Sequence, residues 1–315
     1  MRPMGQNFGQ DATSDVARDL VVIFTEDADW HTRTLCRALE HEGLRVLVLS
    51  LNDCGFAIGE TPHGLLLPGL DGQLPAAAFV RVIAKGSTEQ ITMRLGVLHA
   101  LRELGVKVMN DARAIERCVD KSMTSFLVAR AGLPTPRTFV REDAAAMQAL
   151  IDAAPGDTVL KPLFGAQGKG LRRIGPRQPL PEPEKVGGVY YLQEFVEGRR
   201  HDGLFQDWRV FVVGGRAVAA MVRRSERWIT NIHQGAAGEP APLDGPAADI
   251  AIAATAAVGA DYAGVDLIEE AGGGFTVLEV NSMPAWKGLQ KTTETDVAAA
   301  MARHLVDCLH PVSVA

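Results

Sequence analysis

The chain has 315 residues, of which 47% are hydrophobic and 22% charged, a composition typical of a soluble globular protein long enough for two domains. Its 32 basic and 38 acidic residues give a net charge of −6, which argues against a general nucleic-acid or anionic-membrane surface. The sequence has no apolar stretch near the roughly 18 residues of a membrane span. We therefore expect neither a nucleic acid nor a membrane as a partner.

The beginning of the chain and its cysteines indicate a cytoplasmic protein. Residues 1–19 are polar and lack the hydrophobic stretch of a signal peptide, so we expect a disordered tail. The cysteines are scattered without C-x-x-C spacing, at Cys36, Cys54, Cys118 and Cys308. This pattern favours reduced thiols and argues against a zinc site built from them.

Residues 20–118 are predicted to form a small α/β domain. Apolar, β-branched runs predict strands at 20–24, 45–49, 78–83 and 106–110. Apolar residues at helical spacing, each followed by a glycine, predict helices at 30–41 and 92–104. Because strands and helices alternate, the strands are expected to be parallel.

The rest of the chain is predicted to mix hairpins with helices. Gly214-Gly215 is a two-residue turn signal between strands at 207–213 and 217–222. A loop is expected at 176–183, where prolines cluster. Further strands are expected at 138–140, 190–196, 264–267 and 277–281, and helices at 121–131, 144–153, 249–259 and 296–308.

Three oxygen-bearing side chains near the C-terminal end lie within apolar runs that are predicted to be strands. These are Asp266, Glu279 and Asn281. Side chains alternate along a strand, so Glu279 and Asn281 are expected to point to one face and Leu278 and Val280 to the other. Two carboxylates and an amide from adjacent strands would suit Mg²⁺, which prefers oxygen ligands and substrate phosphates. One such carboxylate alone would more often be a half-exposed residue at a strand end.

A glycine-dense loop follows a strand that ends in Lys161. The loop runs from Phe164 to Gly170, and a second strand then returns. Glycine allows backbone N–H groups to approach an anion closely, so such a loop can fold over phosphates. It is not a P-loop, because Gly170 rather than Ser or Thr follows Lys169, and its glycine spacing is not that of a dinucleotide fingerprint. A glycine-rich hairpin alone is a weak signal, which the lysine and the acidic triplet strengthen.

Two further segments could complete a nucleotide site. The strand-like run 190–196 could present backbone groups and Glu194 to an adenine and a ribose. Arg223 and Arg224 end another predicted strand. Taken singly they are most often solvated, but beside phosphates they become candidates for neutralising a transferring phosphoryl group.

As a set and in their order along the chain, these motifs resemble those of the ATP-grasp enzymes, and most closely the RimK-like amino-acid ligases. The resemblance covers roughly residues 20–310 and includes the segment 287–293. It is carried by Lys121, Lys161 with its glycine loop, Gln193-Glu194-Phe195-Val196, Asp207-x-Arg209, Arg223-Arg224, Thr230-Asn231, Gly264-Val265-Asp266 and Glu279-Val280-Asn281. The chain departs from the pattern at Ile229, where relatives carry Arg, and at Trp286, which could shape a different acceptor pocket.

The resemblance implies an α/β (α+β) protein with the ATP-grasp fold and an N-terminal parallel α/β pre-ATP-grasp domain. The implied domains are 20–118, a central subdomain at 119–190 with the glycine loop, and a C-terminal subdomain at 191–315 with the metal site. ATP and Mg²⁺, or Mn²⁺, are the implied cofactors. Metal ligation falls to Asp266, Glu279 and Asn281, and catalysis to Arg209, Arg223 and Arg224. Nucleotide binding falls to Lys121, Lys161, Gly165, Gln167, Gly168, Gly170, Gln193, Glu194, Phe195, Val196, Asp207, Thr230 and Asn231.

The implied reaction joins a carboxylate to an amine through an acyl phosphate, with a small-molecule carboxylate acceptor and an amino acid, L-glutamate above all, as substrates. Similarity around residues 86–91 and 228–231 favours acceptors of the coenzyme type, such as tetrahydromethanopterin. Three alternatives remain open: an ATP-binding regulatory protein without ligase activity, a ligase that modifies a protein C-terminus, and a ligase similar to the D-alanine:D-alanine enzymes. Whether the chain forms a homo-oligomer is also left open.

Overall fold

The computed structural model describes residues 16–165 and 168–310. The chain divides into two compact units. The first comprises the chain up to Ala112 together with the part from Met301 onward, and the second is Arg113–Ala300. In the described part of the chain, the helices are all too short or too polar to cross a membrane.

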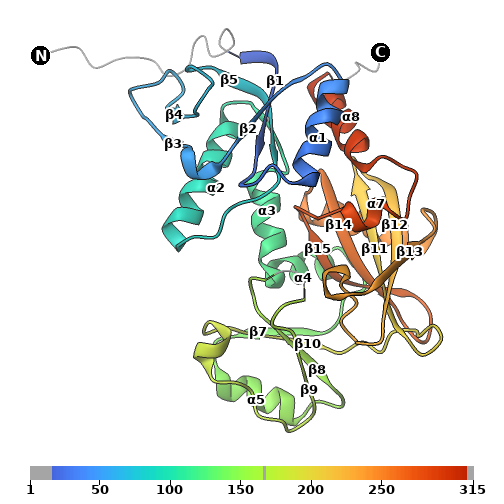
Figure 1. The fold of residues 1–315 in the computed structure, drawn as a ribbon. Coiled ribbons are helices and arrows are strands. Elements are labelled where there is room, and N and C mark those ends of the chain that lie inside the picture. The colour runs from blue at the N-terminus through green and yellow to red at the C-terminus, as the bar shows by residue number, and fades with distance from the viewer. Residues whose placement is uncertain (1–15, 166–167, 311–315) are drawn as a thin grey trace, which may run out of the picture. The chain divides into compact units, whose positions relative to one another are not determined.

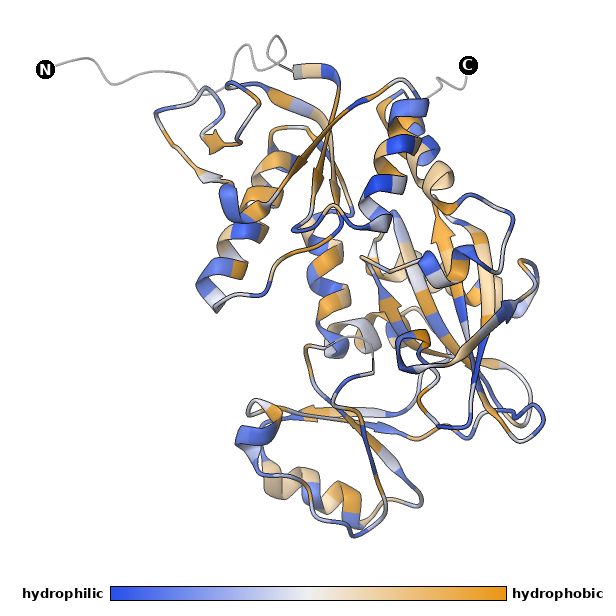
Figure 2. Cartoon of the chain, viewed as in Figure 1, coloured by the Kyte–Doolittle hydropathy of each residue, from blue (hydrophilic) through white to orange (hydrophobic). Residues whose placement is uncertain are grey.

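The first unit is built on a parallel sheet with the order β2-β1-β5-β6, of which β1, β2 and β5 can be found in Figure 1. The strands are β1 (Val16–Phe24), β2 (Arg45–Leu49), β5 (Leu74–Val80) and β6 (Lys107–Met109). Its inner strands are largely hydrophobic (Figure 2), and the second halves of β1 and β5 are fully buried. The predicted parallel α/β sheet is therefore confirmed, although β1 begins at Val16, inside the predicted tail; residues 1–15 lie outside the described part.

Helices α1 (Trp30–His41) and α2 (Thr88–Glu103) connect these strands. Asp29 caps α1 by accepting a hydrogen bond from the Thr32 backbone N–H. Helix α2 begins four residues before the predicted start, because Ser87 and Gln90 form a reciprocal capping box there. The short hairpin β3 (Gly55–Phe56) and β4 (Leu65–Leu66) and the helix α3 (Ala112–Val119) were not predicted.

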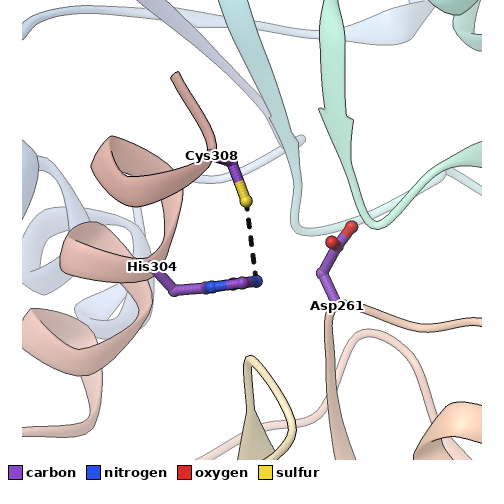
Figure 3. A group of neighbouring side chains, drawn as sticks. All are labelled: Asp261, His304 and Cys308. Atoms are coloured by element: carbon purple, nitrogen blue, oxygen red, sulfur yellow. Dashed lines mark hydrogen bonds between the residues drawn. The ribbon is translucent and has the colours of Figure 1, made fainter. Parts of the chain in front are cut away.

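Helix α8 (Val297–Leu309) closes the described chain. Its later turns belong to the first unit, where Arg303 Nε lies 3.5 Å from Glu42 Oε1. His304 and Cys308 are four residues apart on this helix and point toward each other, with 3.8 Å between Nε2 and Sγ (Figure 3). All four cysteines are free thiols.

The second unit contains two antiparallel sheets. The smaller has the order β7-β10-β8-β9, with β7 (Thr138–Arg141), β8 (Thr158–Lys161), β9 (Arg172–Ile174) and β10 (Tyr190–Glu194). Helix α5 (Ala144–Asp152) packs on it through Met147 and Ile151, against Leu160, Tyr190 and Leu192.

The larger sheet has the order β13-β12-β11-β14-β15. Its strands are β11 (Phe205–Val213), β12 (Arg216–Ser225), β13 (Ala237–Pro240), β14 (Tyr262–Glu269) and β15 (Phe275–Asn281). Gly214 and Gly215 form the predicted turn, with φ of 56° and 72°, values that glycine adopts without strain. Helices α4 (Lys121–Arg130) and α6 (Pro246–Val258) contribute to the core on one face of this sheet, and the short α7 (Lys287–Gln290) follows β15.

Candidate nucleotide and metal site

A pocket that is partly open to solvent lies within the second unit, with an empty volume of about 950 Å³ when the open solvent in its mouth is included. It is lined by the end of β8, by the residues from Gln193 to Val196 and by the polar face of the larger sheet. Twelve of the predicted site residues line it, namely Lys161, Gly168, Gln193, Glu194, Phe195, Val196, Asp207, Arg223, Thr230, Asn231, Asp266 and Glu279. The predicted site residues are therefore largely gathered at one place.

Strand alternation separates the two faces of the larger sheet. Val210, Val265 and Val280 point into the core, where they pack with α6. Their neighbours Arg209, Asp266 and Glu279 point to the opposite face, and the register pairs Arg209 with Asp266 and Asp266 with Glu279 across adjacent strands. The same two-residue period that builds the core thus lines up charged groups beside the pocket.

Four of these charged residues form a buried ionic cluster. Asp266 accepts hydrogen bonds from both Nε and Nη2 of Arg209, the latter at 2.7 Å. Asp207 accepts from Nε of Arg223 at 2.7 Å and also from its Nη2, which lies 3.1 Å from Asp266 as well. Two carboxylates therefore balance two guanidiniums, which removes much of the cost of burying these charges.

The pKa values of the two carboxylates in this cluster are shifted in opposite directions. Burial raises the pKa of Asp207, and Arg223 offsets this only in part. Burial alone would also raise the pKa of Asp266, but Arg209 and Arg223 together outweigh it and hold that pKa below its usual value. Asp266 is therefore the more firmly ionised of the two.

The oxygen donors expected to hold Mg²⁺ lie on two paired strands. Asp266 faces Glu279 in the register, and Asn281 faces Gly264, whose carbonyl accepts from Asn281 Nδ2 at 3.3 Å. Two carboxylates and an amide are hard oxygen donors, so this set fits Mg²⁺ or Mn²⁺.

The prediction that Leu278 points away from Glu279 is wrong. The register shifts between the pairs Asp266–Glu279 and Leu267–Val277, so Leu278 is the extra residue of a β-bulge. Leu278 lines the pocket next to Glu279, and the bulge lets Val277 and Val280 both reach the core. A bulge of this kind has no signal in the alternation pattern.

Two lysines lie beside these carboxylates. Lys161 Nζ lies 5.9 Å from the centre of the Tyr191 ring, and burial lowers the pKa of Lys161 to about 8 even though Glu279 favours its charged form. Lys121 Nζ donates to the Gly165 carbonyl at 2.7 Å and lies 3.3 Å from Glu279 Oε1. Lys121 therefore connects the glycine loop to β15.

Two residues of the glycine loop adopt positive φ, a backbone conformation that favours glycine. Gly168 and Gly170 have φ of 68° and 78°. A Cβ at Gly168 would lie 2.8 Å from Ile229 Cγ2. Gln167 lies outside the described residues. The start of the loop is held by Lys121, which donates to the Gly165 carbonyl.

The segment after β10 forms an aromatic corner of the pocket. The Phe195 ring meets Trp228 edge to face at 6.0 Å, and the Arg173 guanidinium lies 3.8 Å above it. The Gln193 side chain donates to Thr138 Oγ1 at 3.0 Å and to the Tyr191 hydroxyl at 3.1 Å, so it also braces the sheet. The pocket further includes residues that were not assigned to it, among them Val159, Leu171, Trp228, Ile229 and Ile268. The sequence signal that could have assigned them to the pocket was their position, as apolar residues, next to the polar motifs.

Several predicted residues lie apart from the pocket lining. Arg224 projects from the face of β12 opposite to Arg223 and pairs with Glu239, because successive strand residues point to opposite sides. Trp286 is fully buried with its ring 6.3 Å from that of Phe211, so it belongs to the core and not to a pocket wall. Arg209 is not part of the pocket lining, but it donates to Asp266, which is.

Comparison with known proteins identifies the family of the chain. Residues 118–305 match the model of the RimK-like ATP-grasp domain. The chain belongs to the RimK-like ATP-grasp family. It is thus an ATP-grasp ligase, which forms an amide from a carboxylate and an amine at the expense of ATP.

Relatives and solved structures of this family match over much of the chain. Tetrahydromethanopterin:alpha-L-glutamate ligase of Methanococcus maripaludis is 40% identical over 228 residues, which cover 70% of this chain and 75% of that protein. A probable alpha-L-glutamate ligase of Haemophilus influenzae is 28% identical over 296 residues, covering 91% and 96%. The ATP-grasp ligase PsnB, complexed with minimal precursor, Mg and ADP, superposes with a TM-score of 0.70 at 21% identity, covering 93% and 98%.

Proposed function

We propose that this RimK-like ATP-grasp protein adds L-glutamate, or another amino acid, to the carboxylate of a coenzyme-like small molecule, with ATP and Mg²⁺. The observation that carries the proposal is the row of Glu279, Asp266 and Arg209 across three strands, with Arg223 beside it. Binding a nucleotide does not by itself call for both oxygen donors for a cation and guanidiniums beside them. The names of the relatives support glutamate and the coenzyme class.

The reaction would take place in two steps. A carboxylate oxygen of the acceptor attacks the γ-phosphorus, the bond to the β,γ-bridging oxygen breaks, and ADP leaves. The amine of the amino acid then attacks the acyl carbon, phosphate leaves with the carbon–oxygen bond electrons, and the nitrogen loses a proton. Catalysis rests on positioning and on positive charge, so no covalent nucleophile of the protein is needed.

Each group of residues would have one task in this reaction. Lys121 and Lys161 would hold the α- and β-phosphates, and the glycine loop would cover them. Asp266, Glu279 and Asn281 would hold Mg²⁺, which neutralises charge on the β- and γ-phosphates when it is bound. Arg209 and Arg223 would stabilise the transferring phosphoryl group. The adenosine would bind to the segment from Gln193 to Val196, and Thr230 and Asn231 would lie near the phosphates.

The test is a screen of ADP release across amino acids and carboxylate acceptors, followed by trapping. With the acceptor that supports turnover, hydroxylamine in place of the amino acid should yield a hydroxamate, because an acyl phosphate reacts with any good nucleophile. A reaction without acceptor is the control and should give none. Turnover with a proven acceptor but no hydroxamate would refute the acyl-phosphate route. Binding of ATP without turnover on any acceptor would favour a regulatory protein, and turnover on a peptide C-terminus alone would change the acceptor class.

A further inference from the structure

Arg223 lies between two carboxylates that compete for it. Its Nε and Nη2 both bond to Asp207, while the same Nη2 lies 3.1 Å from Asp266 Oδ1. The Asp207 bond is the shorter and bidentate one, and a forked pair of this geometry is stronger than a single contact. Arg223 is 3% exposed, so solvent offers it little else to bind.

We infer that Asp207 is a positioning residue that holds the Arg223 guanidinium. It thereby keeps this second guanidinium from competing with a divalent cation for Asp266, which already accepts from Arg209 through both oxygens. This rests on the proposed role of Asp266 as a metal ligand. Without Asp207, the buried guanidinium would have Asp266 as its remaining carboxylate in the cluster. Cation and guanidinium would then compete for the same oxygens, in a cluster whose charge has changed from neutral to +1.

The inference gives Asp207 a different task from the nucleotide binding expected for it. Both of its oxygens face Arg223, its partner across β11 and β12 in the register. A residue that acts on a metal ligand through a second residue resembles the outer partners of metal sites, whose loss typically weakens metal binding about 10- to 100-fold.

The test compares Asp207→Asn with wild type in two binding assays. Mn²⁺ is titrated into protein saturated with ADP and followed by the electron paramagnetic resonance of free Mn²⁺. ADP affinity is measured separately in EDTA. We expect Mn²⁺ to bind about tenfold or more weakly to the variant, while ADP in EDTA binds at least as tightly because the pocket has become more positive. Unchanged Mn²⁺ affinity would overturn the inference.

A matched control and a rescue separate this effect from damage to the fold. Glu239→Gln removes the partner of Arg224 on the other face of β12 and should leave Mn²⁺ affinity unchanged. In Asp207→Asn/Arg223→Met the competing guanidinium is gone, so most of the wild-type Mn²⁺ affinity should return; no recovery would refute the competition. Arg223→Met alone should bind Mn²⁺ as tightly as wild type or more tightly, which keeps the inference testable if Asp207→Asn does not fold.

A further variant distinguishes failure of the metal assignment itself from failure of the inference about Asp207. Asp266→Asn should weaken Mn²⁺ binding strongly. If it does not, the proposed metal site itself is wrong. If it does, and Asp207→Asn matches wild type, only the inference about Asp207 falls.

Discussion

At the scale of single residues, two arginines and two lysines of the site lie in different surroundings. Arg223 and Arg224 are adjacent in the sequence. Arg223 is buried against Asp207 and Asp266, whereas Arg224 pairs with Glu239, whose side chain is half-exposed. Lys161 and Lys121 both lie near Glu279, and burial of the Lys161 ammonium lowers the pKa of that residue to about 8, whereas the Lys121 ammonium donates to the Gly165 carbonyl. Such differences make separate tests possible.

The pKa of Lys161 predicts how ATP binding depends on pH. With a pKa of about 8, the ammonium is charged below that pH and loses its proton as the pH rises through it. If Lys161 holds phosphates, kcat/KM for ATP should fall above about pH 8. The Lys161→Arg variant keeps its charge and should show no such fall, so a decline shared by both proteins would contradict this assignment.

Glu279 provides the direct test of metal dependence. Glu279→Gln keeps the size of the side chain but loses its charge, so Mg²⁺-dependent ADP formation should drop about 100-fold or more. ADP binding in EDTA serves as the control for folding and should persist. Turnover at the wild-type rate would show that Glu279 does not bind the metal.

Burial also predicts which cysteines react. Burial raises the pKa of Cys54 to about 11 and of Cys118 to about 12, so both should resist a thiol reagent at neutral pH. The half-buried Cys36 and Cys308 should react first, and all four only after denaturation. Mass spectrometry of partially labelled protein checks the order; early labelling of Cys118 would contradict the described packing.

At the scale of elements, the glycine loop is attached both to the strand that precedes it and to a neighbouring helix. The loop follows Lys161 at the end of β8 and is held at its start by Lys121 of α4. A loop that is anchored at its start in this way can close over phosphates when a nucleotide binds.

Substitutions at two glycines can distinguish the effect of backbone strain from the effect of a steric contact with a neighbouring side chain. Gly168 and Gly187 have nearly equal φ, 68° and 69°, but a Cβ meets Ile229 only at Gly168 and finds open space at Gly187. Valine at either site should cost about 1–3 kcal/mol of stability. Only Gly168→Val should also raise KM for ATP and increase ATP hydrolysis without ligation. Equal kinetics of the two variants would show that the loop is an ordinary turn.

At the scale of the whole molecule, nucleotide binding should stabilise the second unit. A ligand at 100 times its Kd adds about 2.7 kcal/mol to the folded state. ADP with Mg²⁺ should therefore raise the melting temperature by more than ADP in EDTA. In Glu279→Gln the Mg²⁺-dependent part should vanish while the nucleotide part remains. A full Mg²⁺ effect in that variant would contradict the metal assignment.

The sequence by itself determined the type of most elements and the two-sided character of the larger sheet. Apolar residues recur at the period of a strand or a helix, and that period depends only on local backbone geometry. Glu279 could therefore be assigned to the face opposite Val280, and Gly214-Gly215 to a tight turn, before the fold was known.

Tertiary structure alone decided which charges meet and where regularity breaks. The pairing of Asp207 with Arg223 depends on the register of two strands, and the exposure of Leu278 to the pocket depends on a bulge between two others. The Trp286 side chain is apolar, so it would suit either the core or a pocket wall, and its packing against Phe211 places it in the core. Register, bulges and packing arise from contacts between residues distant in sequence, and local periodicity carries no information about those contacts.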